Sequence, residues 1–269
     1  MCRLLGMVSP EPASFADAVG DAQIAAFRDL ACLHMDGWGA AWLDEAGSLE
    51  RYRWEGRADK DPAYDLIAAT ANTRAGVMHL RWATSGMPAA PGNTHPFAAD
   101  GVAFAHNGFA GKPKELDELM APEILGTLEG VTDSERYFGV IRTYLARGLA
   151  LPEAAALSAA RLREGYPGRS LNAMLLSADH LVVVHASERS APDVDDMLAS
   201  GFTLETLPAE HADAYFTMRM RRDADGTLVF ASSGLDTRGW EPLPPESVIS
   251  VDLRTGALAA AEIRPAPVR

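Results

Sequence analysis

Apolar side chains change their spacing several times along the chain, and these changes predict interleaved helices and strands. Residues 16–33 carry apolar side chains that fall roughly on one helical face, which predicts an amphipathic helix. A second helix is predicted over 61–71, with Asp61 as the N-cap and Pro62 in the first turn. Two consecutive helices are predicted further along, over 133–147 and 152–164.

Short apolar runs bounded by turn residues predict the strands. Residues 37–54 have aromatic side chains on two arms around an Asp-Glu-Ala-Gly turn, which predicts a hairpin. The other predicted strands cover residues 4–8, 77–83, 102–105, 171–177, 181–186, 215–221, 228–231 and 248–253. Because strands and helices do not alternate regularly, we expect an α+β domain of two largely antiparallel sheets with helices outside, and not a doubly wound parallel sheet.

Composition excludes several classes of protein. The chain has 269 residues, and 24 basic against 37 acidic side chains give a formal net charge of −13. That charge argues against a nucleic-acid partner and against docking on anionic lipid. No apolar run is long enough to span a membrane, and the N-terminal apolar stretch is too short for a signal peptide. We therefore expect a cytoplasmic protein.

The search for a nucleophile leads to two cysteines, because the chain has no G-x-S-x-G elbow. Removal of Met1 would make Cys2 the terminal residue, whose α-amino group, with a pKa of roughly 7.7–8.0, can serve as its own base. The plain alternative is that a cysteine at position 2 has no role. Cys32 lies within an apolar helical pattern, and we expect it to be a buried small residue.

Polar and aromatic residues concentrate between positions 79 and 108. Arg81 is suited to bidentate binding of a carboxylate, and Asn107-Gly108 offers an amide and a backbone N–H for an oxyanion. Three other polar or aromatic residues that could line a site have structural alternatives. Trp82 could belong to the core, His95 could be a turn residue before Pro96, and Asp133 could be the N-cap of its helix. His79 and His106 are expected to be buried and hydrogen-bonded. Histidine and cysteine spacing matches no metal signature, so no metal is expected.

Several of these segments together resemble one family. Cys2 after a removable Met, His-Leu-Arg-Trp-Ala-Thr-Ser-Gly at 79–86, Asn-Thr-His-Pro-Phe at 93–97 and His-Asn-Gly at 106–108 are similar to the class II glutamine amidotransferases. These are N-terminal nucleophile hydrolases with a four-layer αββα sandwich. The opening Met-Cys-Arg-Leu-Leu-Gly and His-Met-Asp-Gly-Trp-Gly at 34–39 resemble the stand-alone branch, which includes the γ-glutamyl hydrolase of ergothioneine biosynthesis.

The resemblance implies a single type 2 domain over residues 2–269, after loss of Met1, and a set of site residues. Cys2 would attack the side-chain carbonyl of a glutamyl amide to form a γ-glutamyl thioester, without a metal or an organic cofactor. The other implied roles are the oxyanion hole (Asn107, Gly108), the substrate α-carboxylate (Arg81), the α-ammonium group (Asp133) and the walls of the glutamyl pocket (Trp82, Thr84, His95).

Three functions remain open at this stage. The chain could hydrolyse glutamine or a γ-glutamylated pathway intermediate, or act as a glutaminase subunit that delivers ammonia to a separate synthetase partner. A third alternative is a non-catalytic glutamate-binding module. Loops 165–170, 187–192 and 232–240 are the candidates for the leaving-amine pocket. In the last of these, Ala-Ser-Ser-Gly at 231–234 stands where the branch has Ala-Ser-Glu-Pro, so the local pocket is expected to differ.

Overall fold

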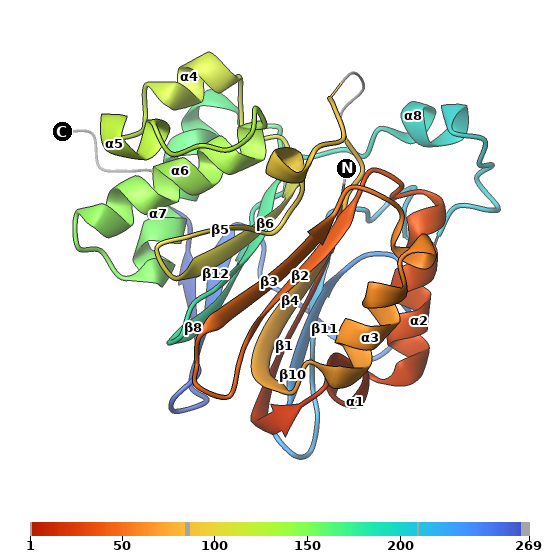
Figure 1. Cartoon of the computed structure of the whole chain (residues 1–269). Coiled ribbons are helices and arrows are strands. Elements are labelled where there is room, and N and C mark those ends of the chain that lie inside the picture. The colour runs from red at the N-terminus through yellow and green to blue at the C-terminus, as the bar shows by residue number, and fades with distance from the viewer. Residues whose placement is uncertain (1, 84–86, 209, 265–269) are drawn as a thin grey trace.

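Two antiparallel sheets lie face to face between two groups of helices in the computed structural model, which describes residues 2–83, 87–208 and 210–264 (Figure 1). The first sheet has the strand order β11-β9-β10-β1-β4-β2-β3, and the second β13-β12-β8-β7-β6-β5. The strands of the first sheet are β1 (Arg3–Ala13), β2 (Trp38–Leu43), β3 (Leu49–Trp54), β4 (Thr73–Leu80), β9 (Met218–Arg222), β10 (Leu228–Ser232) and β11 (Glu241–Pro242). Those of the second are β5 (Phe97–Ala99), β6 (Val102–Gly108), β7 (Leu171–Leu176), β8 (His180–His185), β12 (Ser247–Asp252) and β13 (Leu258–Glu262).

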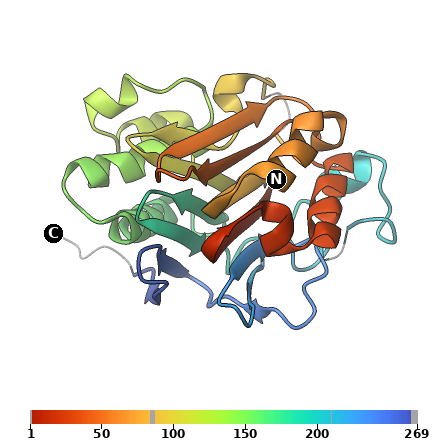
Figure 2. The same cartoon turned by 60° about the horizontal axis from the view of Figure 1, so that its bottom comes forward.

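The helices cover the outer faces of the two sheets. Figure 2 shows the red and orange helices on one side of the strands and the green helices on the other. Helices α1 (Phe15–Val19), α2 (Asp21–Asp29) and α3 (Pro62–Thr70) pack on the first sheet. Four helices lie on the side of the second sheet: α4 (Pro113–Asp117), α5 (Pro122–Leu125), α6 (Asp133–Ala146) and α7 (Leu151–Gly165). Helix α8 (Val194–Ala199) follows β8 and precedes β9 along the chain. Short 3₁₀ turns cover Leu30–Cys32, Ala58–Lys60 and Pro91–Asn93.

Three apolar layers hold this arrangement together. One lies between the two sheets and includes Leu4, Met174 and Phe230, each fully buried. The other two lie between each sheet and its helices. The expected α+β class, with two antiparallel sheets and helices outside, is therefore confirmed, and the layers form the αββα sandwich that the resemblance implied.

The predicted helix over 16–33 is wrong in detail. Gly20 has φ +100°, a value that an α-helix cannot accommodate, so the segment divides into α1, which Ser14 caps, and α2. A 3₁₀ turn follows α2, and it leaves Cys32 exposed and not buried as expected. The apolar positions still face the first sheet, which explains why their spacing resembled a single helix.

Other boundaries follow local signals closely. Asp61 caps α3 by accepting a hydrogen bond from the Ala63 N–H, and the hairpin of β2 and β3 closes at its predicted turn. The predicted strand over 215–221 begins only at Met218, and Tyr215 lies in the preceding loop, buried in a small apolar cluster with Trp82 and Phe216. Within the described ranges, no helix is both long and apolar enough to cross a membrane.

Candidate active site

Cys2 lies at the junction of the two sheets. It immediately precedes β1, which is hydrogen-bonded on both sides, to β10 and to β4, so the start of this strand is firmly placed. The Cys2 backbone nitrogen lies 2.9 Å from Asn107 Oδ1 on β6, in the other sheet. Its buried thiol lies 3.8 Å from the Trp82 carbonyl oxygen. The fold thus brings together two residues that are 105 positions apart in the sequence.

Asn107 and Gly108 form the end of β6 that faces Cys2. The Asn107 Oδ1 is occupied by the Cys2 nitrogen, whereas its buried Nδ2 has no hydrogen-bond partner among the described residues. A buried donor without a partner costs free energy, which indicates a place for an acceptor that arrives with a ligand. At position 108 a Cβ atom would overlap the Ser170 carbonyl oxygen, so the close approach of β7 requires glycine there.

Arg81 follows β4 and is clamped by the segment before β2. Its Nη1 donates to the Asp36 carbonyl oxygen at 3.0 Å, and its backbone N–H donates to Gly37 at 2.8 Å. The Asp36 carboxylate in turn accepts a hydrogen bond from the Ala83 N–H at 2.8 Å. Arg81 is 3% exposed, and these contacts fix the position of its guanidinium before any ligand binds.

Asp133 is the first residue of α6 but is not its N-cap, so the structural alternative for this residue is wrong. Thr132 is the cap, and its hydroxyl accepts from the Glu135 N–H at 3.1 Å. The Asp133 carboxylate instead accepts from the Ala110 N–H at 2.7 Å, just beyond the end of β6 at Gly108. Desolvation raises the pKa of the Asp133 carboxyl above its ordinary value, because burial disfavours the charged form.

The remaining residues expected in the glutamyl pocket differ in their surroundings. Trp82 is buried against Tyr215 and Phe216, so its ring belongs to a small apolar cluster while its carbonyl contacts the Cys2 thiol. His95 is buried, with its ring centroid 4.2 Å from that of His79, and neither ring nitrogen has a partner in the described parts of the chain. Burial lowers its pKa well below the ordinary value. Thr84 lies outside the described residues.

His79 and His106 are buried and hydrogen-bonded, as the sequence predicted. The His79 Nε2 lies 3.3 Å from the His106 carbonyl oxygen, and His106 bridges Ser134 Oγ at 2.9 Å and the Ser170 carbonyl at 3.3 Å. Burial lowers the pKa of His106 to about 4, so the ring is neutral near pH 7. Within residues 2–83, 87–208 and 210–264, no three His, Cys, Asp or Glu side chains are grouped to hold a metal ion.

Sequence reasoning missed the contact of Arg3 with the Cys2 carbonyl oxygen, and the contacts of Tyr215 and Ser233 with Arg3. Arg3 is fully buried, and its Nε donates to the Cys2 carbonyl oxygen at 2.5 Å. Its Nη1 donates to the Tyr215 carbonyl at 3.2 Å and to both the carbonyl and the hydroxyl of Ser233. The only sequence signal was a cation inside an otherwise apolar strand.

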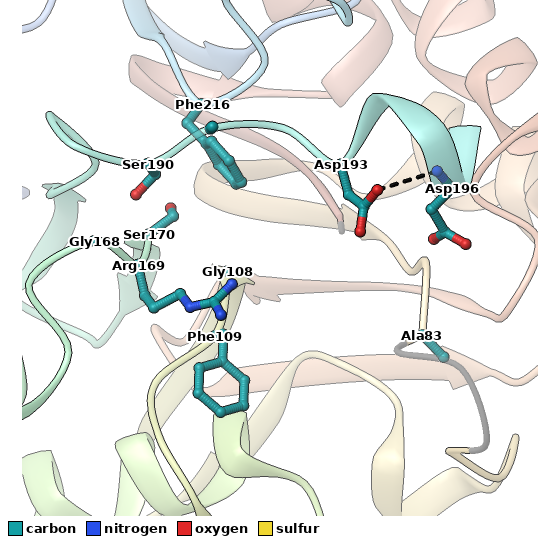
Figure 3. A pocket seen from close by; sticks show the side chains of 11 residues that line it. Ala83, Gly108, Phe109, Gly168, Arg169, Ser170, Ser190, Asp193, Asp196 and Phe216 are labelled. Atoms are coloured by element: carbon teal, nitrogen blue, oxygen red, sulfur yellow. Dashed lines mark hydrogen bonds between the residues drawn. The ribbon is translucent and has the colours of Figure 1, made fainter. Parts of the chain in front are cut away.

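A cavity of about 400 Å³ opens beside this centre (Figure 3). Gly108 and Ala83 form part of its wall, so it adjoins both the proposed oxyanion donors and the segment next to the thiol. Arg169, Phe109 and Ser190 line it on one side, and Asp193 and Asp196 lie across from Arg169 (Figure 3). Loops 165–170 and 187–192 thus contribute residues to the cavity, whereas loop 232–240 does not line it.

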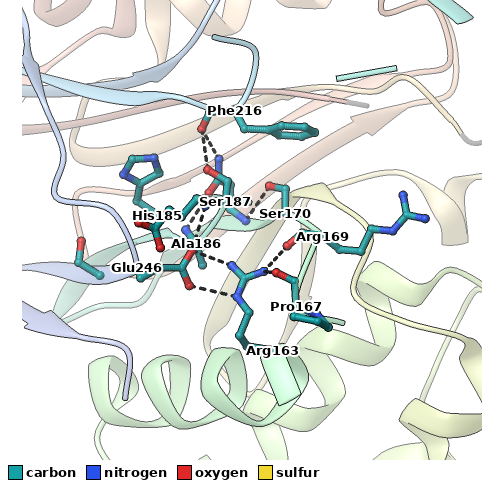
Figure 4. Close-up of polar contacts among 12 residues, drawn as sticks. Arg163, Pro167, Arg169, Ser170, His185, Ala186, Ser187, Phe216 and Glu246 are labelled. Atoms are coloured by element: carbon teal, nitrogen blue, oxygen red, sulfur yellow. Dashed lines mark hydrogen bonds and ion pairs between the residues drawn. The ribbon is translucent and has the colours of Figure 1, made fainter. Parts of the chain in front are cut away.

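One ion pair fixes both of these loops (Figure 4). Arg163 on α7 binds Glu246 bidentately, at 2.8 and 3.0 Å, and donates to the carbonyl oxygen of Arg169. Glu246 also accepts from the Glu188 N–H at 3.0 Å. Because the pair is largely buried and linked to the backbone of both loops, the wall of the cavity is built before ligand binding.

Comparisons with known proteins identify the family of this chain. The chain matches the family described as "Glutamine amidotransferases class-II" over residues 1–267, and it belongs to that family. It is 35% identical to a glutamine–fructose-6-phosphate aminotransferase (isomerizing) of Gluconobacter oxydans over 167 residues, which is 62% of this chain and 26% of that protein. The match to the enzyme of the same name from Caulobacter vibrioides is 34% over 251 residues, 87% of this chain and 37% of that protein.

Solved structures show the same fold. A class II glutamine aminotransferase domain protein from Silicibacter pomeroyi superposes with a TM-score of 0.66 at 20% identity, covering 98% of this chain and all of that one. The glutamine phosphoribosylpyrophosphate amidotransferase of B. subtilis gives 0.63 at 16% identity, covering 98% of this chain and 49% of that one. The chain spans about a quarter of the length of the first curated relatives. Family membership confirms the expected family, the class II glutamine amidotransferases.

Proposed function

We propose that this chain is an amidohydrolase that cleaves the γ-glutamyl amide of glutamine or of a γ-glutamylated intermediate through a Cys2 thioester. The observation that carries the proposal is the pairing of Cys2 with Asn107. The backbone nitrogen that becomes the α-amino group on loss of Met1 lies 2.9 Å from Oδ1, and the buried Nδ2 is left without a partner. One side chain thereby orients the base and offers a donor for the oxyanion.

The reaction follows from these atoms. The α-amino group of Cys2 takes the thiol proton, and Sγ attacks the γ-carbonyl carbon while the carbonyl electrons move onto oxygen. Asn107 Nδ2 and the Gly108 N–H donate to that oxyanion. When the C–N bond breaks, the leaving nitrogen takes the proton from the Cys2 ammonium and departs as the free amine. Water, deprotonated by the same amine, then hydrolyses the thioester to release glutamate and the thiol.

The glutamyl end is recognised by Arg81 and Asp133 in this proposal. The fixed guanidinium suits the α-carboxylate, and the carboxylate suits the α-ammonium group. Because desolvation raises the pKa of Asp133, arrival of the ammonium lowers that pKa again and stabilises the charged pair. We assign Trp82, Thr84 and His95 to the walls of the glutamyl pocket, as the resemblance implied.

The cavity supports a leaving amine larger than ammonia. About 400 Å³ beside Gly108 is far more than one ammonia molecule occupies, and neither Arg81 nor Asp133 lines that space. A γ-glutamylated intermediate, as in the stand-alone branch with the ergothioneine-pathway hydrolase, fits this space. We further propose that residues 2–269 form one type 2 domain without a metal or cofactor. A cytoplasmic location and the lack of a nucleic-acid or membrane partner remain predictions from charge and hydropathy.

Ammonia delivery to a separate synthetase is the second candidate function. It is favoured by the curated relatives, which are aminotransferases about four times the length of the aligned segment. Glutamine turnover that stays negligible until a partner is added would favour this role. A non-catalytic glutamate-binding module is the third, and it predicts tight glutamate binding without hydrolysis of any γ-glutamyl amide.

Labelling of the nucleophile tests the proposal. The protein is treated with a glutamine-analogue diazoketone, and the intact mass is measured before and after. We expect loss of Met1, one adduct on Cys2, no adduct in Cys2→Ala and an unchanged adduct in Cys32→Ala, since the other free cysteine, Cys32, takes no part in the proposed chemistry. An unlabelled Cys2 with Met1 retained would refute the proposal. A panel of γ-glutamyl amides, followed by mass spectrometry, then identifies the leaving amine.

A further inference from the structure

Arg3 is a fully buried cation beside the proposed nucleophile. Its guanidinium contacts neutral groups: the carbonyl oxygens of Cys2, Tyr215 and Ser233 and the Ser233 hydroxyl. It also lies over the Tyr215 ring, 3.6 Å from the centroid, and its Nη2 is buried without a hydrogen-bond partner in the described part of the chain. Desolvation lowers the pKa of this guanidinium, although arginine remains charged near pH 7.

Burial of a guanidinium without a carboxylate partner opposes folding. No ion pair of Arg3 with an Asp or Glu is found within the described residues, although other buried arginines, such as Arg142, have one. An apolar side chain at this position of β1 would avoid the cost. The retained charge therefore points to a role in the chemistry next to it.

The charge lies close to the Cys2 backbone nitrogen. Nε is 2.5 Å from the Cys2 carbonyl oxygen, and standard bond lengths then place it within about 7 Å of the nitrogen of the same residue. Like charges at that separation, in a partly desolvated site, shift an ammonium pKa downward by roughly one to two pH units. This effect acts on the group that the proposed mechanism uses as its base.

We propose that Arg3 is a positioning residue that fixes the Cys2 carbonyl and, through its buried charge, keeps the Cys2 α-amino group neutral near pH 7. This inference rests on the proposed function, because the amino group exists only after Met1 is lost. A neutral amine can accept the thiol proton, whereas an ammonium group cannot. The fork of hydrogen bonds sets the orientation of Cys2, and the charge sets the pH range in which it reacts.

The other groups that face Cys2 do not supply this charge. Asn107 and Ser233 are neutral, and burial raises the pKa of Tyr215 far above the physiological range. On the neighbouring strands β4 and β6, burial lowers the pKa values of His79 and His106, so both are neutral. Arg81 and Asp133, the charged residues of the glutamyl site, stay the same in the variants below.

The test compares Arg3→Gln with Arg3→Lys. The measurement is the pH dependence of kcat/KM for amide hydrolysis, or of the rate of diazoketone labelling. In Arg3→Gln we expect the acidic limb to move to higher pH by roughly one to two units, because the ammonium is no longer repelled. In Arg3→Lys, which keeps the charge but loses the fork, we expect a lower rate with an unmoved limb. An unmoved limb in Arg3→Gln, or equal shifts in both variants, would overturn the inference.

A measurement on the unaltered protein covers the case in which Arg3→Gln does not fold. The fraction of Cys2 α-amine acylated by a small anhydride is followed by mass spectrometry as a function of pH. We expect a midpoint roughly one to two units below the ordinary value of about 7.7–8.0 for an α-amino group. A midpoint at or above that value overturns the role of Arg3. Failure of the proposed function is distinguishable, since Cys2 would then resist the diazoketone at every pH.

Discussion

Replacing Asn107 separates its two tasks and tests the oxyanion hole directly. Asn107→Asp keeps an oxygen near the Cys2 nitrogen, 2.9 Å away in the structure, but it removes the buried Nδ2 donor. It also places a negative charge where the oxyanion forms. Asn107→Ala removes the acceptor and the donor together, without adding a charge. Asn107→Asp, although isosteric, is therefore expected to lower activity more than Asn107→Ala.

The magnitudes can be set from the two effects. Loss of one oxyanion donor lowers kcat by about 10²- to 10³-fold, or roughly 2.7–4 kcal/mol. A carboxylate about 4 Å from the oxyanion, at an effective dielectric constant near 20, adds repulsion of about 4 kcal/mol, a further factor of about 10³. We expect activity in the order Asn107 > Ala > Asp, with the aspartate variant near or below the detection limit.

The assay is kcat/KM for release of glutamate from glutamine or a γ-glutamyl amide. Alkylation of Cys2 by iodoacetamide, in a Cys32→Ala background because Cys32 is exposed, serves as the control, since that reaction uses the same thiolate but forms no oxyanion. Thermal unfolding verifies that both variants fold. An aspartate variant that is within tenfold of the unaltered protein, or more active than the alanine variant, would refute the assignment of Nδ2 as an oxyanion donor.

Three further changes probe binding, packing and pH response. Arg81→Lys keeps the charge but loses the fork, and we expect KM for glutamine to rise about tenfold or more with a smaller change in kcat; an unchanged KM would contradict the role. Gly39→Ala pushes a Cβ into the His95 carbonyl, and we expect a loss of about 1–3 kcal/mol in urea unfolding, against no loss in Gly165→Ala, where space is open. Since the pKa of His106 is about 4 in the folded state and about 6.5 unfolded, its neutral burial stabilises the fold fully above pH 6.5 and less as pH falls, by about 2 kcal/mol at pH 5. The slope of unfolding free energy against pH should be shallower in His106→Asn, and an equal slope would contradict it.

Signals that act within a few residues predicted the structure well. Asp61 and Pro62 mark the start of α3 because capping involves only the next turn, and the Ala63 N–H indeed donates to Asp61. The prediction of a single helix over 16–33 is wrong because the apolar face is continuous while the helical backbone is interrupted. Gly20 adopts φ +100°, and only packing on the first sheet determines that α1 and α2 turn there. The exposure of Cys32 depends on the same turn.

The residues of the candidate site also differ in whether local or distant contacts determine their place. Cys2, Arg81 and Asn107 were predicted because each lies in a local motif whose residue types suit acyl transfer. The sequence alone assigns no role to Arg3, because its burial depends on Tyr215 and Ser233, more than two hundred positions away. The spacing of residues along β1 does not show whether Arg3 is buried among carbonyl and hydroxyl groups or faces solvent.

The position of the nucleophile explains why the site and the fold cannot be separated. Cys2 immediately precedes β1, which has a neighbouring strand on each side, so the first sheet fixes the strand that follows it. The acceptor of its nitrogen and the proposed oxyanion donors belong to β6, in the second sheet. The centre therefore exists only where the two sheets meet, and any change that alters their apolar interface, at Leu4 or Met174 for example, moves Cys2 relative to Asn107. Because a displacement of about 1 Å costs on the order of 10²-fold in rate, and truncation of a fully buried side chain costs about 2–5 kcal/mol, substitutions in this interface should reduce both activity and stability.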